Sequence, residues 1–234
     1  MRAHKLIGAT LAAMLAVGGI ALAKFEPKFD LKLSDLKRGG NPQADIHLEF
    51  AADDEEIGAF KMTLPKGTNV ASDEDIPDAA GPIPTRSEGS GEEIGGGTVV
   101  IRVGPDCRPG PEGALPIGTE VTLDATIYER PRTDAEADEG VHAVWFLDLE
   151  PANRVRLLVK GSPQTGWTVE GAPTPSDNTC NPLTVDLTIN AKSESGVPII
   201  TNPTKGKKMV ITAEIVSQDS PAVATFKKVF KLSK

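Results

Sequence analysis

Closely spaced carboxylates are the residues in this sequence best suited to chemistry. Asp73, Asp75 and Asp78 fall together in a stretch that is rich in proline, glycine and acidic residues. Oxygen ligands at short spacing in an extracellular loop are typical of calcium sites, so these aspartates are candidate calcium ligands. The run does not match an EF-hand loop, and a solvated acidic loop is the interpretation that we favour. The sequence indicates no cofactor other than calcium.

Trp167 is the candidate residue for binding a sugar. It follows a turn-forming run at residues 163–166, so we expect its ring to lie near the surface, where it could stack on a sugar. Pairs of carboxylates could flank a glycosidic bond. The chain has only 7 Phe, 2 Trp and 1 Tyr, however, which is a small supply of stacking platforms. A calcium-assisted carbohydrate-binding module or a glycan-active enzyme is therefore the alternative hypothesis.

A nucleophilic or transition-metal site has little support in the sequence. Beyond the N-terminal run the chain has two histidines: His47 lies on the polar face of an alternating stretch, and His142 shares a face with apolar residues. A hydrogen-bonded histidine at the edge of a core is the simpler interpretation of His142. The chain lacks a G-x-S-x-G motif and the His and Cys clusters that zinc or copper requires. We predict no catalytic residues and a protein that is not an enzyme.

The N-terminus has the layout of a signal peptide. Basic residues Arg2 and Lys5 precede an uncharged run of 18 residues that ends in Ala21, Leu22 and Ala23. Small residues at these positions predict a signal peptide at 1–23, cleaved before Lys24. The competing interpretation is an uncleaved anchor, for which the run is short and rich in alanine and glycine. We expect a secreted or cell-surface protein with no transmembrane segment after cleavage.

Cys107 and Cys180 are the two cysteines of the chain. In an oxidising compartment, an even pair without metal-type spacing is expected to form a disulfide. Such a bridge would close a loop of 73 residues, which the chain-entropy model values at about 4 kcal/mol. Two buried free thiols are the alternative.

The charge of the chain is acidic and unevenly distributed. The net charge is −8, and removal of Arg2 and Lys5 with the leader makes it −10, which disfavours nucleic acid as a partner. Residues 24–150 hold 12 basic and 27 acidic residues, whereas residues 151–234 hold 11 and 6. The two parts could attract opposite partners, could face each other within one fold, or could carry solvated acidic loops, which is the interpretation that we favour.

Lysines are concentrated near the C-terminus. They could form a patch for acidic wall polymers or lipid head groups, although charges on strand edges also prevent sheets from pairing with one another. Protection of an edge is the interpretation that we favour. The lysines concerned are Lys205, Lys207, Lys208, Lys227, Lys228, Lys231 and Lys234.

Alternation of apolar and polar residues predicts strands along most of the chain. In residues 119–129, for example, Val121, Leu123, Ala125 and Ile127 alternate with polar residues, the period of a strand with one buried face. Together with 23 Gly and 19 Pro, which supply turns, this pattern favours an all-β fold. We predict an antiparallel β-sandwich, immunoglobulin-like or jelly-roll-like, of about a dozen strands. The predicted strands are 28–33, 44–50, 58–64, 98–103, 119–129, 141–149, 154–160, 167–170, 183–190, 197–201, 208–216 and 225–232.

The chain after the leader is expected to form one domain, residues 24–234. A long mobile loop is predicted at 65–95, because this stretch shows almost no apolar period. An exposed, acidic hairpin tip is predicted at 131–140. A boundary near 171–177, where proline and small residues interrupt the strands, would instead divide the chain into two β-domains.

Several turn and strand-opening motifs follow one another in a characteristic order. They are Asn41-Pro42 with Ala44-Asp45, Leu64-Pro65-Lys66-Gly67, the run Gly95 to Val99, and the run Gly196 to Thr204, which contains Thr201-Asn202-Pro203-Thr204. In these motifs the chain resembles a group of uncharacterised secreted actinobacterial β-sandwich proteins. The resemblance covers about half of the chain after the leader and implies an exported β-sandwich, but no particular activity.

These patterns together predict a non-catalytic protein. We expect a secreted or cell-surface β-sandwich with a structural, adhesive or ligand-binding role. The partner is not specified by the sequence, although contact with cell-wall or surface glycans fits the expected location.

Overall fold

The computed structural model describes residues 25–51, 57–76, 91–104, 115–150, 153–172 and 181–234. Several features predicted from the sequence lie outside these residues: the leader at 1–23, Cys107, Cys180 and Asp78. The signal peptide and the disulfide therefore remain predictions.

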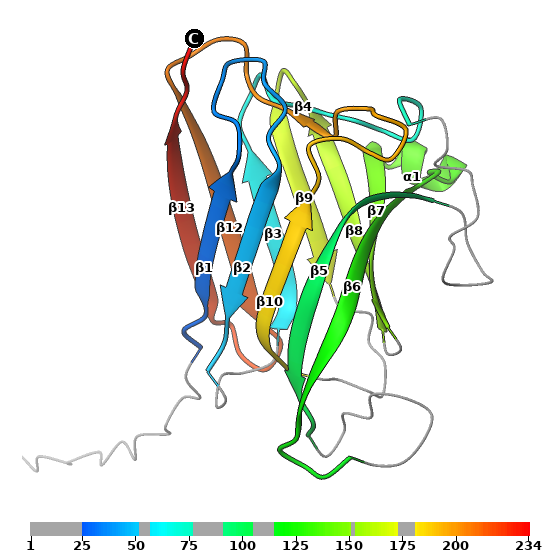
Figure 1. Cartoon of the computed structure of the whole chain (residues 1–234), viewed down its shortest axis with the longest axis vertical. Helices are drawn as coiled ribbons and strands as arrows, with labels where there is room; N and C mark the ends of the chain where they lie inside the picture. Colours follow the sequence, from blue (N-terminus) through cyan, green and yellow to red (C-terminus); the bar gives the residue numbers. More distant parts are fainter. Residues whose placement is uncertain (1–24, 52–56, 77–90, 105–114, 151–152, 173–180) are drawn as a thin grey trace, which may run out of the picture.

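Strands account for nearly all of the regular structure in the described ranges, and every neighbouring pair in the sheets is antiparallel (Figure 1). The predicted all-β, antiparallel class is confirmed. The elements are β1 (Lys28–Leu33), β2 (Ala44–Glu49), β3 (Ile57–Leu64), β4 (Asn69–Val70), β5 (Glu92–Arg102), β6 (Glu120–Arg130), α1 (Asp134–Asp138), β7 (Val141–Glu150), β8 (Asn153–Ser162), β9 (Gly166–Ala172), β10 (Asn181–Ile189), β11 (Ile200–Thr201), β12 (Lys208–Ser217) and β13 (Val223–Lys231).

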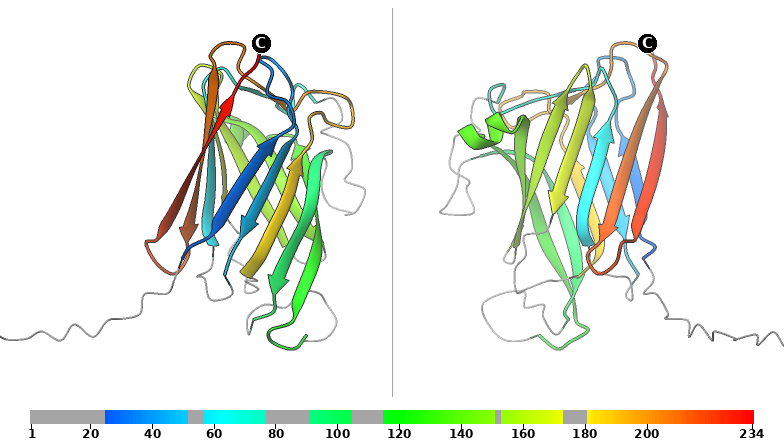
Figure 2. Two further views of the ribbon diagram at one scale, coloured as in Figure 1. Left: turned by 60° about the vertical axis from the view of Figure 1, so that its left-hand side comes forward. Right: turned by 180° about the vertical axis from the view of Figure 1, so that it is seen from behind.

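Eleven of these strands form one continuous sheet, in the order β1-β2-β10-β5-β6-β7-β8-β9-β3-β12-β13. The sheet rolls over so that β1, β2, β10 and β5 lie on one side and β8, β9, β3 and β12 on the other (Figures 1 and 2). A sandwich of two separate sheets is not confirmed, because the two layers belong to one hydrogen-bonded sheet. Strands that follow residues 171–177 in the sequence are inserted among those that precede them: β10 lies between β2 and β5, and β12 pairs with β3.

The two edge strands, β1 and β13, come together where the rolled sheet meets itself. The rings of Phe29 and Phe226 lie 5.5 Å apart between centroids. On the same two strands, Lys228 Nζ donates to Asp30 Oδ1 over 2.5 Å. These contacts are made by side chains, so the sheet is nearly closed without a continuous ladder between its edges.

The interior is filled by one side chain from every second position, as the alternation predicts. Leu123, Ala125 and Ile127 on β6 are buried, whereas the polar residues between them face outward. Burial of a large aliphatic side chain stabilises the fold by about 1.5–3 kcal/mol relative to exposure, so this shared interior supplies most of the driving force. Its fully buried members include Ile94, Trp145, Val159, Trp167, Ile199 and Ile215.

The segment predicted as a mobile loop at 65–95 differs from that expectation in its described parts. Residues 68–76 contain β4, which pairs with β11 in a separate two-stranded sheet, and bury Val70 and Ile76 in the main core. The backbone amide of Ala71 donates to the carbonyl oxygen of Ile199 over 2.9 Å. Residues 91–95 lead into and belong to β5, while 77–90 lie outside the described residues.

The predicted hairpin tip at 131–140 does connect the antiparallel strands β6 and β7 and is mostly exposed, but it also contains a short helix, which was not predicted. Thr133 is the N-cap of α1, and its side-chain oxygen accepts from the backbone amide of Glu136. The Glu136 carboxylate accepts from the backbone amide of Thr133, which completes a capping box. In the described part of the chain, no helix has the length and apolar character needed to span a membrane.

Glycines in β5 allow its backbone to approach β10 closely. A Cβ atom at Gly95 would lie 2.1 Å from the carbonyl oxygen of Thr188, and one at Gly97 would lie 1.9 Å from that of Asp186. No side chain fits at these distances. The Gly95 to Gly97 run therefore has a packing reason.

We expect Gly97→Ala to destabilise the protein by about 2–3 kcal/mol, because the added methyl group must push β5 away from β10. The matched control is Gly104→Ala, since a Cβ at Gly104 has no heavy atom within 4 Å. Urea denaturation followed by circular dichroism measures both. Equal stability of the two variants would contradict the close approach.

Candidate functional site

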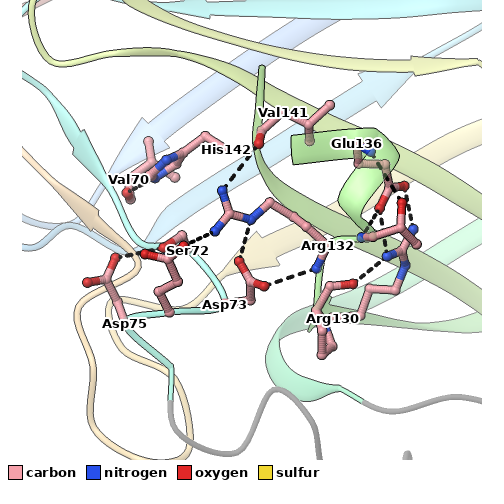
Figure 3. A network of polar contacts seen from close by, with 12 residues as sticks. Val70, Ser72, Asp73, Asp75, Arg130, Arg132, Glu136, Val141 and His142 are labelled. Atoms are coloured by element: carbon pink, nitrogen blue, oxygen red, sulfur yellow. Dashed lines mark hydrogen bonds and ion pairs between the residues drawn. The ribbon is translucent and has the colours of Figure 1, made fainter. Parts of the chain in front are cut away.

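Charged side chains gather at the end of the rolled sheet that carries β4 and α1 (Figure 3). We call the set Asp73, Glu74, Arg130, Arg132 and Glu136 the end network. It joins the segment after β4, the end of β6 and helix α1. It is the densest group of ion pairs in the described residues.

Arg132 connects the segment after β4 to the end of β6. Its Nε atom donates to Asp73 Oδ1 over 2.6 Å, and its backbone amide donates to Asp73 Oδ2 over 3.0 Å. A terminal nitrogen also donates to Glu74 Oε1 over 2.6 Å. The Arg132 and Asp73 side chains are only 16% and 14% exposed. The pair therefore fixes a chain segment in place and leaves little surface for a ligand.

Glu136 is the second centre of the end network. Its Oε1 accepts from Arg130 over 2.5 Å and also from Arg156, and its Oε2 accepts from Arg130 over 2.9 Å. Burial alone would raise the pKa of Glu136, but the hydrogen bonds and charge of Arg130, with the bonds from Thr133, lower it to about 2. This carboxylate is therefore ionised and held by two arginines at neutral pH.

Arg130 also packs against an aromatic ring on the outer face of the sheet. Its guanidinium carbon lies 5.2 Å from the centroid of Phe146, and that of Arg154 lies 5.0 Å from the same centroid. Arg154 in turn pairs with the buried carboxylate of Asp148 over 3.3 Å. These cation–π and ionic contacts hold the arginines flat against β7.

Two buried glutamates are cross-strand neighbours near this end of the rolled sheet. Glu129 on β6 lies directly opposite Glu92 on β5, and they are 0% and 3% exposed. Glu92 Oε1 accepts from the backbone amide of Ser195 over 2.6 Å. Neither carboxylate oxygen of Glu129 has a partner in good hydrogen-bond geometry among the described residues, although Trp145 and the backbone of Val144 lie near enough to oppose part of the rise in its pKa. Burial raises the pKa of Glu129 well above its usual value, and the negative charge of Asp73 adds to the effect.

A neutral glutamic acid beside a second carboxyl group is the arrangement that acid–base catalysis uses. Access decides whether it can act. Because Glu129 and Glu92 are buried, a glycan or another bulky substrate cannot reach either group in this conformation.

Trp167 is buried, so the expectation of an exposed ring is wrong. It is 2% exposed, and its indole nitrogen donates to the carbonyl oxygen of Thr68 over 2.7 Å. The ring also packs on His142, with centroids 4.4 Å apart. His142 Nε2 lies 2.8 Å from the carbonyl oxygen of Val70 (Figure 3). Both side chains hold the β4 segment over the core.

The candidate calcium ligands make contacts within the protein. Asp73 is paired with Arg132, as described above. Asp75 Oδ2 accepts from the backbone amide of Ser72 over 3.0 Å and from its hydroxyl group over 3.1 Å. Asp78 lies outside the described residues. Over the ranges that the structure covers, no group of three acidic, His or Cys side chains is placed to hold a metal ion.

Sequence reasoning missed the arginines and glutamates of the end network. Arg132 is separated from its partner Asp73 by 59 positions. Arg130 and Arg156 are separated from their partner Glu136 by 6 and 20 positions, so no local pattern predicts these pairs. One signal was present: Thr133 and Glu136 have the T-x-x-E spacing of a capping box.

No family model matches this chain, and none of the curated proteins compared with it is similar. Any functional argument must therefore come from the residues and contacts described above.

Acid should weaken the fold through Glu136. The pKa of this side chain falls from its usual value of 4.5 to about 2 in the folded protein. The contribution of the ionised Glu136 side chain to the free energy of unfolding is complete above pH 4.5. It is lost as pH falls from 4.5 toward 2, because Glu136 is then protonated in the unfolded chain and must release that proton on folding. The shift corresponds to about 3 kcal/mol. Urea titrations between these pH values measure how the free energy of unfolding depends on pH, and Glu136→Gln should remove most of this dependence. The same pH dependence in the variant and the wild type would contradict the role of Glu136.

Glu129 should act in the opposite direction and at higher pH. Its folded pKa is raised, so the unfolded chain loses the Glu129 proton first, and stability falls as pH rises from about 4.5 toward the folded pKa. Glu129→Gln, which is neutral and of similar shape, should stabilise the protein at pH 7 and have little effect near pH 4. Thermal melts of both proteins over this range check it. If Glu129→Gln raised the melting temperature equally at every pH, Glu129 would not be protonated in the folded protein.

Proposed function

We propose that this chain is a non-catalytic secreted or cell-surface β-protein with a structural, adhesive or ligand-binding role. The observation that carries the proposal is that the side chains suited to chemistry are engaged inside the fold. Asp73 and Asp75 hold the chain around β4, and Trp167 lies in the core. Their contacts account for these residue types without a ligand.

The buried glutamates support the same proposal. Glu129 and Glu92 are the pair in the described residues that most resembles an acid–base pair, and both are sealed beneath the end of the sheet. A catalytic pair has to meet its substrate, whereas a buried pair can only affect stability. The expected consequence for Glu129 is therefore a pH-dependent stability and not an activity.

Export is the second part of the proposal, and the sequence of residues 1–23 carries it. A basic start, an apolar run and small residues before Lys24 are the features that signal peptidases recognise. A rolled antiparallel sheet with a disulfide between Cys107 and Cys180 would suit an oxidising compartment. Mass spectrometry of the secreted protein, without reduction, would identify both the first residue and the bridge.

A calcium titration separates this proposal from a calcium-assisted carbohydrate-binding module. A calcium site at 100 times its dissociation constant would stabilise the protein by about 2.7 kcal/mol, which raises the melting temperature by several degrees. We expect the protein to have the same melting temperature in millimolar calcium as in millimolar magnesium. We also expect no binding to a panel of cell-wall glycans.

Asp73→Asn and Asp75→Asn provide the matched variants. Both should lower the melting temperature equally with calcium and with chelator, because each removes a contact within the protein. A calcium-dependent rise in the wild type that either variant abolishes would overturn the proposal in favour of the carbohydrate-binding module.

A further inference from the structure

The outer face of the β12–β13 hairpin is a cationic and apolar surface on an acidic protein. The side chains of Lys208, Val210, Lys227, Val229 and Lys231 all point outward from it, and we call this set the lysine face. Val210 is 36% exposed and Val229 is 52% exposed, although they lie directly opposite each other. The hairpin lies at one edge of the sheet and is easily reached (Figure 2).

More lysines flank this face near the C-terminus. The backbone amide of Leu232 donates to the carbonyl oxygen of Lys207 over 3.0 Å, which brings the loop before β12 beside the end of β13. Lys205, Lys207 and Lys234 are therefore close to the lysine face, and all three are exposed.

The lysines of this face have no acidic partner among the described residues, a property that they share with Lys32, Lys37, Lys66 and Lys192 but not with Lys28, Lys61 and Lys228. Lys28 pairs with Glu49, Lys61 with Glu170, and Lys228 with Asp30. In contrast, none of the lysines on or beside the lysine face forms an ion pair with any described residue. Glu214 is the one acid on the outer face of β12, toward its other end.

The arrangement also places like charges against each other. Lys208 on β12 lies directly opposite Lys231 on β13, and like charges at such a pair destabilise a sheet. Protection of an edge applies to the lysines on β13 and also to Lys208, because β12 pairs with β3 only from Thr212 to Ser217. Edge protection does not require two lysines to lie directly opposite each other, however. A partner that supplies negative charge would relieve this repulsion.

We propose that the lysine face docks on an anionic lipid bilayer. Lysine side chains would contact phosphate head groups, and the exposed valines between them would lie against the apolar boundary of the bilayer. The valines favour lipid over a soluble polyanion, which offers them no apolar surface. The strongly acidic remainder of the chain is repelled by such a membrane, so the contact is confined to this one face.

This inference names a partner for the binding role proposed above and rests on that role. The two can fail separately. A calcium or glycan result bears on the proposed function, whereas the lipid result bears only on the partner.

Co-sedimentation with vesicles tests the docking surface. The full protein, as its host processes it, is mixed with vesicles of phosphatidylcholine alone or with added phosphatidylglycerol. We expect binding only to the anionic vesicles and release by added salt.

Lys208→Gln with Lys231→Gln should weaken this binding about 30-fold, since each lysine near an anionic surface contributes about fivefold. Lys28→Gln with Lys160→Gln is the matched control, with the same change in net charge, and should bind within about twofold of the wild type. Urea denaturation confirms folding: the first double variant should be at least as stable as wild type, because it removes the opposed pair.

A second pair of substitutions tests the valines. Val210→Thr with Val229→Thr keeps the shape and the β-propensity of both positions, and should weaken vesicle binding without changing binding to soluble polyphosphate. Four outcomes would overturn the proposal: no binding to anionic vesicles, equal binding to neutral vesicles, equal losses in the two lysine double variants, or valine substitutions without effect on vesicle binding.

Discussion

One constraint governs this structure: the inward-facing side chains of a single eleven-stranded sheet must share one interior. An open sheet of this width would leave its apolar face in water, at a cost of about 25 cal/mol for each Å². Rolling removes that cost only if the edges meet. They do so through Phe29 and Phe226, and through Asp30 and Lys228.

Rolling creates a second requirement, because a rolled sheet has open ends. At one end the cover consists of β4, β11 and the segment that buries Val70 and Ile76. These pieces are too short to be stable by themselves, so they depend on side-chain anchors. Trp167 provides one from inside, and Arg132 provides another from the end network. The charges at this end are therefore part of the cover.

The strands could be predicted from the sequence because their cause is local. Period-two burial located all eleven strands of the main sheet, and β1 has the predicted bounds. The single rolled sheet could not be predicted, since the pairing of β2 with β10 and of β3 with β9 and β12 joins distant parts of the chain. The prediction that the Trp167 ring is exposed was wrong for the same reason. Its partner Thr68 is 99 positions away in the sequence, whereas the prediction used only the turn-forming residues next to Trp167. Asp73 likewise finds Arg132 only in the fold.

The uneven charge of the sequence also finds a physical account in the sheet order. Strands of the basic C-terminal part are interleaved with strands of the acidic N-terminal part: β10 lies between β2 and β5, and β3 lies between β9 and β12. Ion pairs form between the two parts, as in Arg154 with Asp148 and Lys228 with Asp30. The two parts thus face each other within one fold. Lysines that have no acidic side chain beside them are not neutralised in this way, however. On the outer face of β12 and β13 the neighbours of Lys208 and Lys231 are each other, valines and threonine. Pairing within the fold therefore leaves a net positive surface at that edge.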